Sequence, residues 1–204
     1  MAESAKPCVI SCGILKTEIE KLMEEGSLNI EPYFLSDRLH YDYKLLEQGL
    51  GGAIRKRLRD CAGRIIVIYG DVCLGFNNEM KALIDKYNVI KVDALNCIDC
   101  LLGGKGKLLE IDPDHVYLFL NPSFIQFFEP WKGKSKEEAR KSFNMLKGII
   151  LLDSLGNLDD FQAEIDEISD YTGLPILERR NVGLDGLKEI LLEAIERLRN
   201  KPNI

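Results

Sequence analysis

Short apolar runs alternate with longer stretches of helical periodicity along the chain. Residues 64–69 (RIIVIY) show the clearest strand pattern, because this β-branched run has no polar alternation and is typical of a strand covered on both faces. The clearest helix is 184–198, where leucines recur at helical spacing. The same criteria predict strands at residues 7–12, 30–35, 89–92, 116–120, 148–152 and 175–177, and helices at 16–25, 42–59, 77–86, 97–102, 137–146, from Pro122 and from Asn157. Three glycines, at 49, 51 and 52, predict that the 42–59 helix is kinked or divided.

Strand and helix alternate about seven times, which is the pattern of a parallel sheet with helices on both faces. We therefore predict a Rossmann-like α/β fold with a single doubly wound, mostly parallel sheet. No linker rich in Pro, Gly or Ser, no internal repeat and no low-complexity tract divides the chain. The economical prediction is one domain that spans residues 1–204.

Composition argues against several classes of protein. The 204 residues carry a formal charge of -6, which does not suit a nucleic-acid-binding protein. No apolar run approaches the roughly 20 residues of a membrane-spanning helix, so we expect no membrane association. The N-terminal residues lack the apolar core of a secretory signal, and we predict a cytoplasmic protein. Because structural disulfides are disfavoured in that compartment, Cys8 and Cys61 are interpreted as packing residues.

The other four of the six cysteines follow predicted strands. Ligands of an open parallel sheet bind beyond the carboxyl ends of its strands. Cys12 ends the first strand, Cys73 follows the third, and Cys97 and Cys100 follow the fourth. His40 follows the second strand. The sequence therefore predicts that four thiols and one imidazole meet at one edge of the sheet.

Thiolates and imidazoles are ligands that zinc prefers, usually in a tetrahedral set of four. Cys12, Cys73, Cys97 and His40 are able to supply that set, with Cys100 in reserve. Four cysteines are equally suited to an iron–sulfur cluster. Cys97 and Cys100 also form a lone CxxC, which fits a dithiol redox pair or half of a metal site. Ordinary buried cysteines are the alternative that requires no ligand.

Two further segments allow more than one interpretation. The basic, glycine-rich run at 103–107 is either a lid that touches an anionic ligand or a solvated turn. A cluster of four aromatic residues follows, consisting of Phe124, Phe127, Phe128 and Trp131. We call these residues the aromatic group, and they form either part of the core, a surface for a flat ligand or a dimer interface.

At these positions the sequence resembles a known family. Residues 10–15, 39–40, 69–73 and 96–104 resemble, in order, the motifs of the uncharacterised family called domain of unknown function 1638. The resemblance covers residues 8–200. Carried over to this sequence, the family pattern marks Cys12, His40, Tyr69, Gly70, Cys73, Cys97 and Gly103. The chain departs from the commoner form at Leu95 and Asn96, where many members carry His-Asp, and at Leu74, where glycine is usual.

Members of that family occur in methanogenic archaea and anaerobic bacteria, often beside corrinoid-dependent methyltransferase components. The resemblance implies a role in corrinoid-linked, one-carbon methyl metabolism. Under this hypothesis a zinc–thiolate site binds or activates a small thiol or methylated substrate, as in a zinc-dependent methyltransferase component. Asp71 and Asn96 then hydrogen-bond to the metal ligands and orient them. Tyr69 lines the pocket, and the substrate site is completed by Gly70, Gly103 and Gly104.

Other functions stay open at this point. One is a non-catalytic accessory protein that handles corrinoid or metal and docks on a methyltransferase, with the acidic stretch 159–178 and the aromatic group as interaction surfaces. Another is an iron–sulfur or dithiol redox protein. The expected partners are a small-molecule substrate or a corrinoid protein, and a homodimer remains an alternative.

Overall fold

The computed structural model describes residues 6–61, 63–128 and 135–201. The chain folds into two compact units. Unit 1 comprises Met1–Lys107 and Asp185–Ile204, and unit 2 comprises Leu108–Leu184. Unit 1 is therefore discontinuous in sequence, since the chain leaves it at Lys107 and returns to it for the last helix. Each unit has its own sheet, where the sequence predicts one sheet in one domain.

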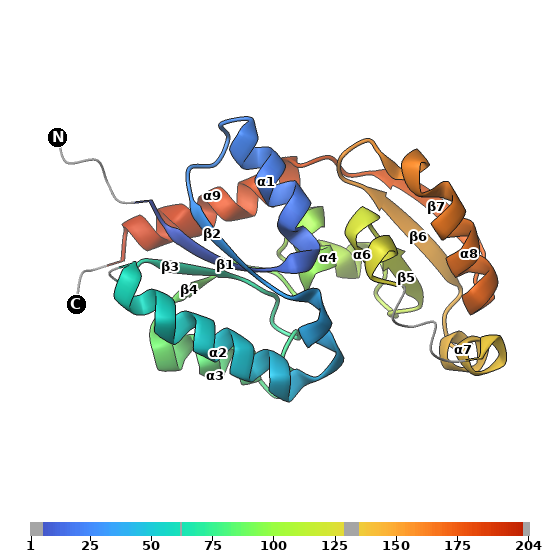
Figure 1. Ribbon diagram of the computed structural model, residues 1–204, viewed down its shortest axis with the longest axis horizontal. Coiled ribbons are helices and arrows are strands. Elements are labelled where there is room, and N and C mark those ends of the chain that lie inside the picture. Colours follow the sequence, from blue (N-terminus) through green and yellow to red (C-terminus); the bar gives the residue numbers. More distant parts are fainter. Residues whose placement is uncertain (1–5, 62, 129–134, 202–204) are drawn as a thin grey trace. The chain divides into compact units, whose positions relative to one another are not determined.

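Unit 1 is built on a parallel sheet whose strand order is β2-β1-β3-β4. Its strands are β1 (Cys8–Cys12), β2 (Glu31–Leu35), β3 (Ile65–Ile68) and β4 (Ile90–Lys91). Its helices are α1 (Lys16–Glu24), α2 (Tyr43–Asp60), α3 (Glu79–Tyr87), α4 (Cys97–Leu102) and α9 (Asp185–Arg199), and its 3-10 turns are η1 (Gly13–Leu15) and η2 (Asp37–Tyr41). In Figure 1, α2 and α3 lie on one face of this sheet, and α1 and α9 lie on the other.

The two central strands of unit 1 are apolar because both of their faces are covered. All residues of β1 and β3 are buried, which agrees with their unbroken apolar runs. The helix α9 buries one stripe, including Leu187, Leu191 and Leu198, as its periodicity predicts. Since β2 and β3 lie on opposite sides of β1, a crevice is expected beyond the carboxyl ends of β1 and β3.

Helix α2 is continuous, and the predicted break at its glycines is wrong. A Cβ at Gly49 would lie 3.0 Å from Leu39 of η2, and one at Gly51 would lie 3.6 Å from Leu83 of α3. The small residues thus permit a close approach to neighbouring segments. Tertiary packing outweighs their unfavourable helix propensity, which is about 1 kcal/mol each.

Cys8 and Cys61 form a disulfide, which corrects their interpretation as separate packing residues. Cys8 begins β1 and Cys61 follows the last residue of α2, and their Cα atoms are 6.1 Å apart. The pairing was not visible in the sequence because 53 residues separate the two cysteines. The packing of α2 on β1 brings them together.

Unit 2 has a parallel sheet of three strands in the order β5-β6-β7. The strands are β5 (Tyr117–Leu120), β6 (Gly148–Asp153) and β7 (Ile176–Asn181), and the helical elements are α5 (Lys107–Ile111), α6 (Pro122–Phe127), α7 (Lys136–Phe143), η4 (Leu158–Phe161) and α8 (Gln162–Thr172). Side chains from α6, α7 and α8 pack on Ile149 and Leu151 of β6 in one core. Phe128 joins this core beside Phe143 and Tyr171, whereas Trp131 of the predicted aromatic group lies outside the described residues.

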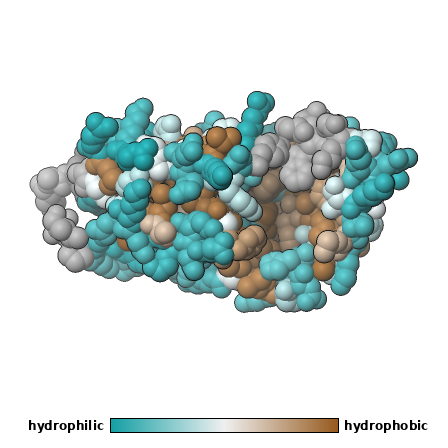
Figure 2. Space-filling model, turned by 90° about the horizontal axis from the view of Figure 1, so that it is seen from below, coloured by the Kyte–Doolittle hydropathy of each residue, from teal (hydrophilic) through white to brown (hydrophobic). Residues whose placement is uncertain are grey.

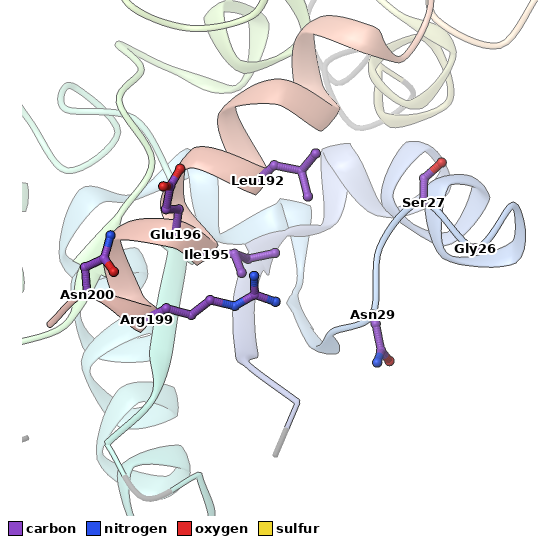
Figure 3. Close-up of a pocket in the computed structure, with 8 residues that line it drawn as sticks. All are labelled: Gly26, Ser27, Asn29, Leu192, Ile195, Glu196, Arg199 and Asn200. Atoms are coloured by element: carbon purple, nitrogen blue, oxygen red, sulfur yellow. The ribbon is translucent and has the colours of Figure 1, made fainter. Parts of the chain in front are cut away.

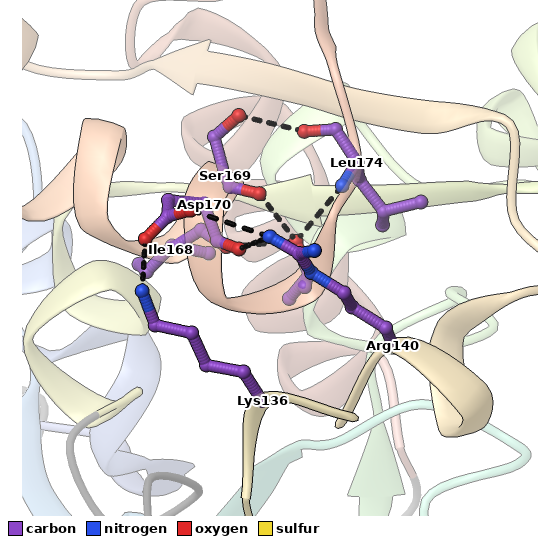
Figure 4. Close-up of polar contacts among 7 residues, drawn as sticks. Lys136, Arg140, Ile168, Ser169, Asp170 and Leu174 are labelled. Carbon is purple, nitrogen blue, oxygen red and sulfur yellow. Dashed lines mark hydrogen bonds and ion pairs between the residues drawn. The ribbon is translucent and has the colours of Figure 1, made fainter. Parts of the chain in front are cut away.

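Polar contacts fasten α7 to α8 within unit 2 (Figure 4). Lys136 forms an ion pair with Asp170, and Arg140 donates to the carbonyl and the carboxylate of the same residue. At the end of α8, the hydroxyls of Ser169 and Thr172 donate to backbone carbonyls at 2.7 Å. The Thr172 contact is made to the carbonyl of Ile168 in the last turn of α8, and the Ser169 contact to that of Leu174 just after the helix.

The predicted α/β class with parallel strands is confirmed, but the strands form two sheets. Strand β4 is only two residues long and pairs with β3. Its free edge therefore has few backbone N–H and C=O groups with which a fifth strand could pair to extend the sheet. Strand β7 continues four residues past the predicted end at Leu177, through charged residues that hid it. The face in Figure 2 is largely hydrophilic, with apolar patches between the charged side chains.

Candidate functional site

The predicted site residues converge at the carboxyl edge of the sheet in unit 1. Cys12 is the last residue of β1, and His40 lies in η2, which follows β2. Cys73 lies in the loop after β3, and Cys97 and Cys100 lie on α4, which follows β4. Each of the four strands is thus followed or ended by a donor residue at the carboxyl edge of the sheet. We call Cys12, His40, Cys73, Cys97 and Cys100 the thiol cluster.

The closest contact in the thiol cluster joins Cys12 to His40. The Cys12 Sγ lies 2.8 Å from the His40 Nε2. The same sulfur accepts a hydrogen bond from the backbone N–H of Ile14 at 3.4 Å, where it caps η1. Burial raises the pKa of the Cys12 thiol to about 12 and lowers the pKa of His40. Both shifts favour a neutral thiol beside a neutral imidazole, and the imidazole tautomer decides which of the two groups donates.

Cys73 is held by a tight turn whose backbone is bound to the next loop. Its sulfur accepts from the N–H of Gly70 at 3.3 Å. The N–H groups of Asp71 and Val72 donate to the carbonyls of residues 94 and 95 at 2.9 and 3.0 Å. Burial raises the pKa of Cys73 to about 11, although the Gly70 N–H and the ammonium of Lys91 oppose that shift. The side chain of Lys91 forms an ion pair with Asp71 at 3.0 Å.

The short helix α4 carries the last two thiols into the cluster. The side chain of Asn96 caps it by accepting from the N–H of Asp99 at 2.9 Å. Burial raises the pKa of Cys97 and of Cys100 well above the ordinary value, and the charges of neighbouring thiolates raise both further. Coulomb interactions with Cys12 and Cys73 show that the four sulfurs share one region.

Several predicted substrate-site residues have structural tasks. Asn96 is a helix cap, and Asp71 is half-exposed and paired with Lys91. The N–H groups of Gly103 and Gly104 donate to the carbonyls of Cys100 and Asp99, so both amides are used inside unit 1. Tyr69 and Gly70 instead lie at the thiol cluster, where Tyr69 interacts with three of the sulfurs.

Sequence reasoning missed two charged residues that shape the cluster. Asp99 is fully buried and accepts from the N–H groups of Leu95 and Gly106, at 2.9 and 3.1 Å. Lys91 donates to the carbonyls of residues 92 and 94. The signal for Asp99 was present, since an acid between two cysteines of an apolar helix needs a partner. No comparable signal marked Lys91.

A separate pocket lies at the other end of the sheet in unit 1 (Figure 3). It is formed by the loop before β2 and the last turns of α9, and its lining residues are Gly26, Ser27, Asn29, Leu192, Ile195, Glu196, Arg199 and Asn200. None of these side chains is a thiol or an imidazole. The thiol cluster is therefore the better candidate for chemistry.

Without metal, the protein is expected to lose stability as the pH rises from 9 to 10. The ordinary thiol pKa is 9.0, and the folded pKa values of Cys12 and Cys73 are about 12 and about 11. The unfolded chain therefore releases these protons at a lower pH than the folded chain. The contribution of the two thiols to stability is complete below pH 9 and decreases as the pH rises toward the folded pKa values. The loss at pH 10 is about 1 kcal/mol for each thiol. Urea unfolding in chelator between pH 8 and pH 10 measures it, and Cys73→Ala should show a smaller loss, because one of the four thiols with a raised pKa is removed. An unchanged midpoint in the unsubstituted protein over this range would contradict the expectation.

Comparison with known proteins assigns the chain to a family. A family model described as protein of unknown function (DUF1638) matches residues 34–191. The chain belongs to this family. The DUF1638 match contains His40, Cys73, Cys97 and Cys100, and it begins after Cys12. No curated protein and no solved structure matched the chain. Across its described segments, every helix is too short or too polar to cross a bilayer.

Proposed function

We propose that the thiol cluster holds a thiophilic metal ion, zinc in the first instance, and with it binds or activates a small thiol or methylated substrate. The observation that carries this proposal is the convergence of four buried thiols and one imidazole from four separate strand ends. Scattered packing cysteines would not be expected to gather at the ligand-binding edge of a parallel sheet. We propose a cytoplasmic location because the four thiols of the cluster are free, and the Cys8–Cys61 disulfide is then an uncommon feature for that compartment.

The chemistry of the donor set fits a soft or borderline divalent ion. Sulfur and imidazole nitrogen are the usual zinc donors. Burial raises the pKa of all four thiols, and the charges of neighbouring thiolates raise those of Cys12, Cys97 and Cys100 further. A cation among them would oppose both effects. Cys12, Cys73 and Cys97 would hold the metal, with His40 or Cys100 as a fourth ligand. Zinc would lower the pKa of a bound thiol and keep it nucleophilic.

For Cys12 and His40 to bind the same metal ion, the distance between them would have to increase. Within residues 6–61, 63–128 and 135–201, no three Cys, His, Asp or Glu side chains are already arranged as a metal-binding group. The Cys12–His40 distance of 2.8 Å is that of a hydrogen bond. Two such ligands on tetrahedral zinc would be about 3.5 Å apart, given Zn–S and Zn–N distances of about 2.3 and 2.0 Å. Cys12 and His40 must therefore separate to share an ion, or His40 stays beside the metal as a base.

The wider setting of the proposal comes from the resemblance described under the sequence analysis, which implies a role beside corrinoid-dependent methyltransferase components. A metal-held thiolate would be a suitable acceptor for a methyl group. We propose that the protein is a component of such a methyl-transfer system. Its partner would then be a corrinoid protein or a small methyl donor.

The Cys12–His40 contact favours a second candidate function that needs no metal. In that case the neutral imidazole of His40 takes the proton of Cys12, and the thiolate attacks a small electrophile. The high pKa of Cys12 opposes this reaction in the unliganded protein, because burial stabilises the neutral thiol. A bound metal offsets that penalty, and we therefore prefer the metal site.

Elemental analysis of protein purified without oxygen or chelator tests the proposal. We expect about one zinc per chain, as for other sites of this donor type. Iron with sulfide would instead indicate an electron-transfer protein. The absence of metal, together with cobalamin or a methyltransferase in a pull-down, would indicate an accessory protein.

Replacing Cys73 by serine is expected to remove most of the zinc. Serine keeps the size of the side chain but not the soft donor atom, and loss of one ligand greatly weakens a four-ligand site. Metal per chain is measured for Cys73→Ser and for the double variant with Cys8→Ala and Cys61→Ala, which removes both cysteines outside the thiol cluster and leaves no new free thiol. Full metal content in Cys73→Ser would refute Cys73 as a ligand.

A further inference from the structure

The hydroxyl of Tyr69 is buried inside the thiol cluster. Tyr69 directly follows β3 and is 1% exposed. Its ring stacks on that of His40, with centroids 6.1 Å apart. Its hydroxyl lies near enough to Cys12, Cys73 and Cys97 for their charges to raise its pKa. The phenol therefore lies beside these three sulfurs.

That hydroxyl has no hydrogen-bond partner among the described residues of the chain. The Cys12 sulfur lies close enough to the hydroxyl that a hydrogen bond between them would raise the pKa of Tyr69 and lower that of Cys12, but the two groups do not form one in this geometry. The sulfurs around it already accept from backbone groups: Cys12 from Ile14, and Cys73 from Gly70. A buried hydroxyl without a partner destabilises the folded protein. Such a group is uncommon and calls for a reason.

The phenol is suited to be a permanent donor. The ordinary pKa of a tyrosine is 10.0, so the proton stays on the oxygen near neutral pH. A donor in a water-poor site binds an anionic acceptor more strongly than a neutral one.

We propose that the Tyr69 hydroxyl donates a hydrogen bond to the small ligand of the thiol cluster and selects a ligand with an anionic sulfur. This inference rests on the proposed function and narrows its substrate class. A small thiol bound as its thiolate offers the missing acceptor. A thioether or a quaternary amine does not. Tyr69 is then a positioning and specificity residue, since it touches the ligand without holding the metal.

The variant Tyr69→Phe tests the proposal, because it removes only the hydroxyl. The first measurement is thermal unfolding of the metal-free protein. We expect the midpoint of Tyr69→Phe to equal or exceed that of the unsubstituted protein, since no hydrogen bond is lost. A clearly lower midpoint would show that the hydroxyl has a structural partner and would overturn the inference.

The second measurement is calorimetric titration of the zinc-loaded protein with two probes of similar size. These are 2-mercaptoethanol and its S-methyl thioether, and both are titrated into protein that carries Cys8→Ala and Cys61→Ala, because the thiol would otherwise reduce that disulfide. In Tyr69→Phe the affinity for the thiol should fall at least about tenfold, while the weaker affinity for the thioether stays unchanged. Equal losses for the two probes, or no loss for the thiol, would overturn the inference. Tyr171→Phe is the matched control, because Tyr171 is buried in the core of unit 2.

Failure of the proposed function gives a different result. Zinc content should be the same in Tyr69→Phe and in the unsubstituted protein, since the phenol is not a ligand. If the unsubstituted protein takes up no zinc, the metal proposal fails by itself. The same two titrations on metal-free protein then decide the role of Tyr69. If the unsubstituted protein binds no thiol with or without zinc, the inference is refuted.

Discussion

Replacing Gly70 by alanine is expected to destabilise unit 1 by about 3 kcal/mol and to disrupt the thiol cluster. A Cβ at this position would lie 2.0 Å from the carbonyl oxygen of Leu95 and 2.2 Å from the backbone nitrogen of Asn96. Both are backbone atoms, so no side-chain rotation relieves the overlap. The loop that carries Cys73 and the loop that leads to Cys97 would have to separate.

The same two loops are joined by backbone hydrogen bonds, which explains why the effect should be large. The N–H groups of Asp71 and Val72 donate to the carbonyls of Ala94 and Leu95. Moving the loops apart breaks these bonds and leaves buried groups unpaired. It also displaces Cys73 relative to Cys97, so metal binding should be lost together with stability.

Urea unfolding and zinc content measure the two effects of Gly70→Ala. The matched control is Gly52→Ala, because the nearest atom to a Cβ there is in the flexible side chain of Arg55, at 3.9 Å. In the interior of α2 that change should stabilise the protein by about 0.5 to 1 kcal/mol. Unchanged stability in Gly70→Ala would refute the close packing of the two loops.

Breaking the Cys8–Cys61 disulfide is expected to lower the free energy of unfolding by about 4 kcal/mol. The bond closes a loop between residues 53 apart, and in the chain-entropy model a loop of this length strongly restricts the unfolded chain. The folded contacts of α2 with β1 remain after reduction. Unit 1 should therefore stay folded without the bond, at a lower urea midpoint.

Two measurements separate the disulfide from other effects of reductant. Denatured, unreduced protein should show four reactive thiols, which are Cys12, Cys73, Cys97 and Cys100, and reduced protein should show six. A variant with both Cys8→Ala and Cys61→Ala should unfold at the same urea concentration with or without reductant. Six thiols before reduction would show that Cys8 and Cys61 are not joined.

The disulfide and the thiol cluster lie at opposite ends of β1. Cys8 is the first residue of the strand and Cys12 is the last. Along α2 the order is reversed, since Cys61 follows the helix and His40 lies in the turn before it. Strand and helix are thus joined covalently at one end and by the Cys12–His40 contact at the other.

The sequence by itself determined the α/β class and the edge at which the donors gather. Unbroken β-branched runs such as 65–68 are sufficient to identify buried parallel strands. Because parallel strands place their carboxyl ends at one edge, the residues that follow them must lie near one another. Cys12, His40, Cys73 and Cys97 were predicted together for that reason.

Only the tertiary structure decided which groups touch. The Cys12–His40 contact joins residues 28 apart, and the Cys8–Cys61 bond joins residues 53 apart. Both depend on how α2 packs on β1, which no local propensity specifies. The division into two sheets depends on the short β4. The hydroxyl of Tyr69 lacks a partner where nearby sulfurs, such as that of Cys12, already accept hydrogen bonds from backbone N–H groups. Pairing between distant residues is a property of the packed chain, whereas strand periodicity is a property of each segment.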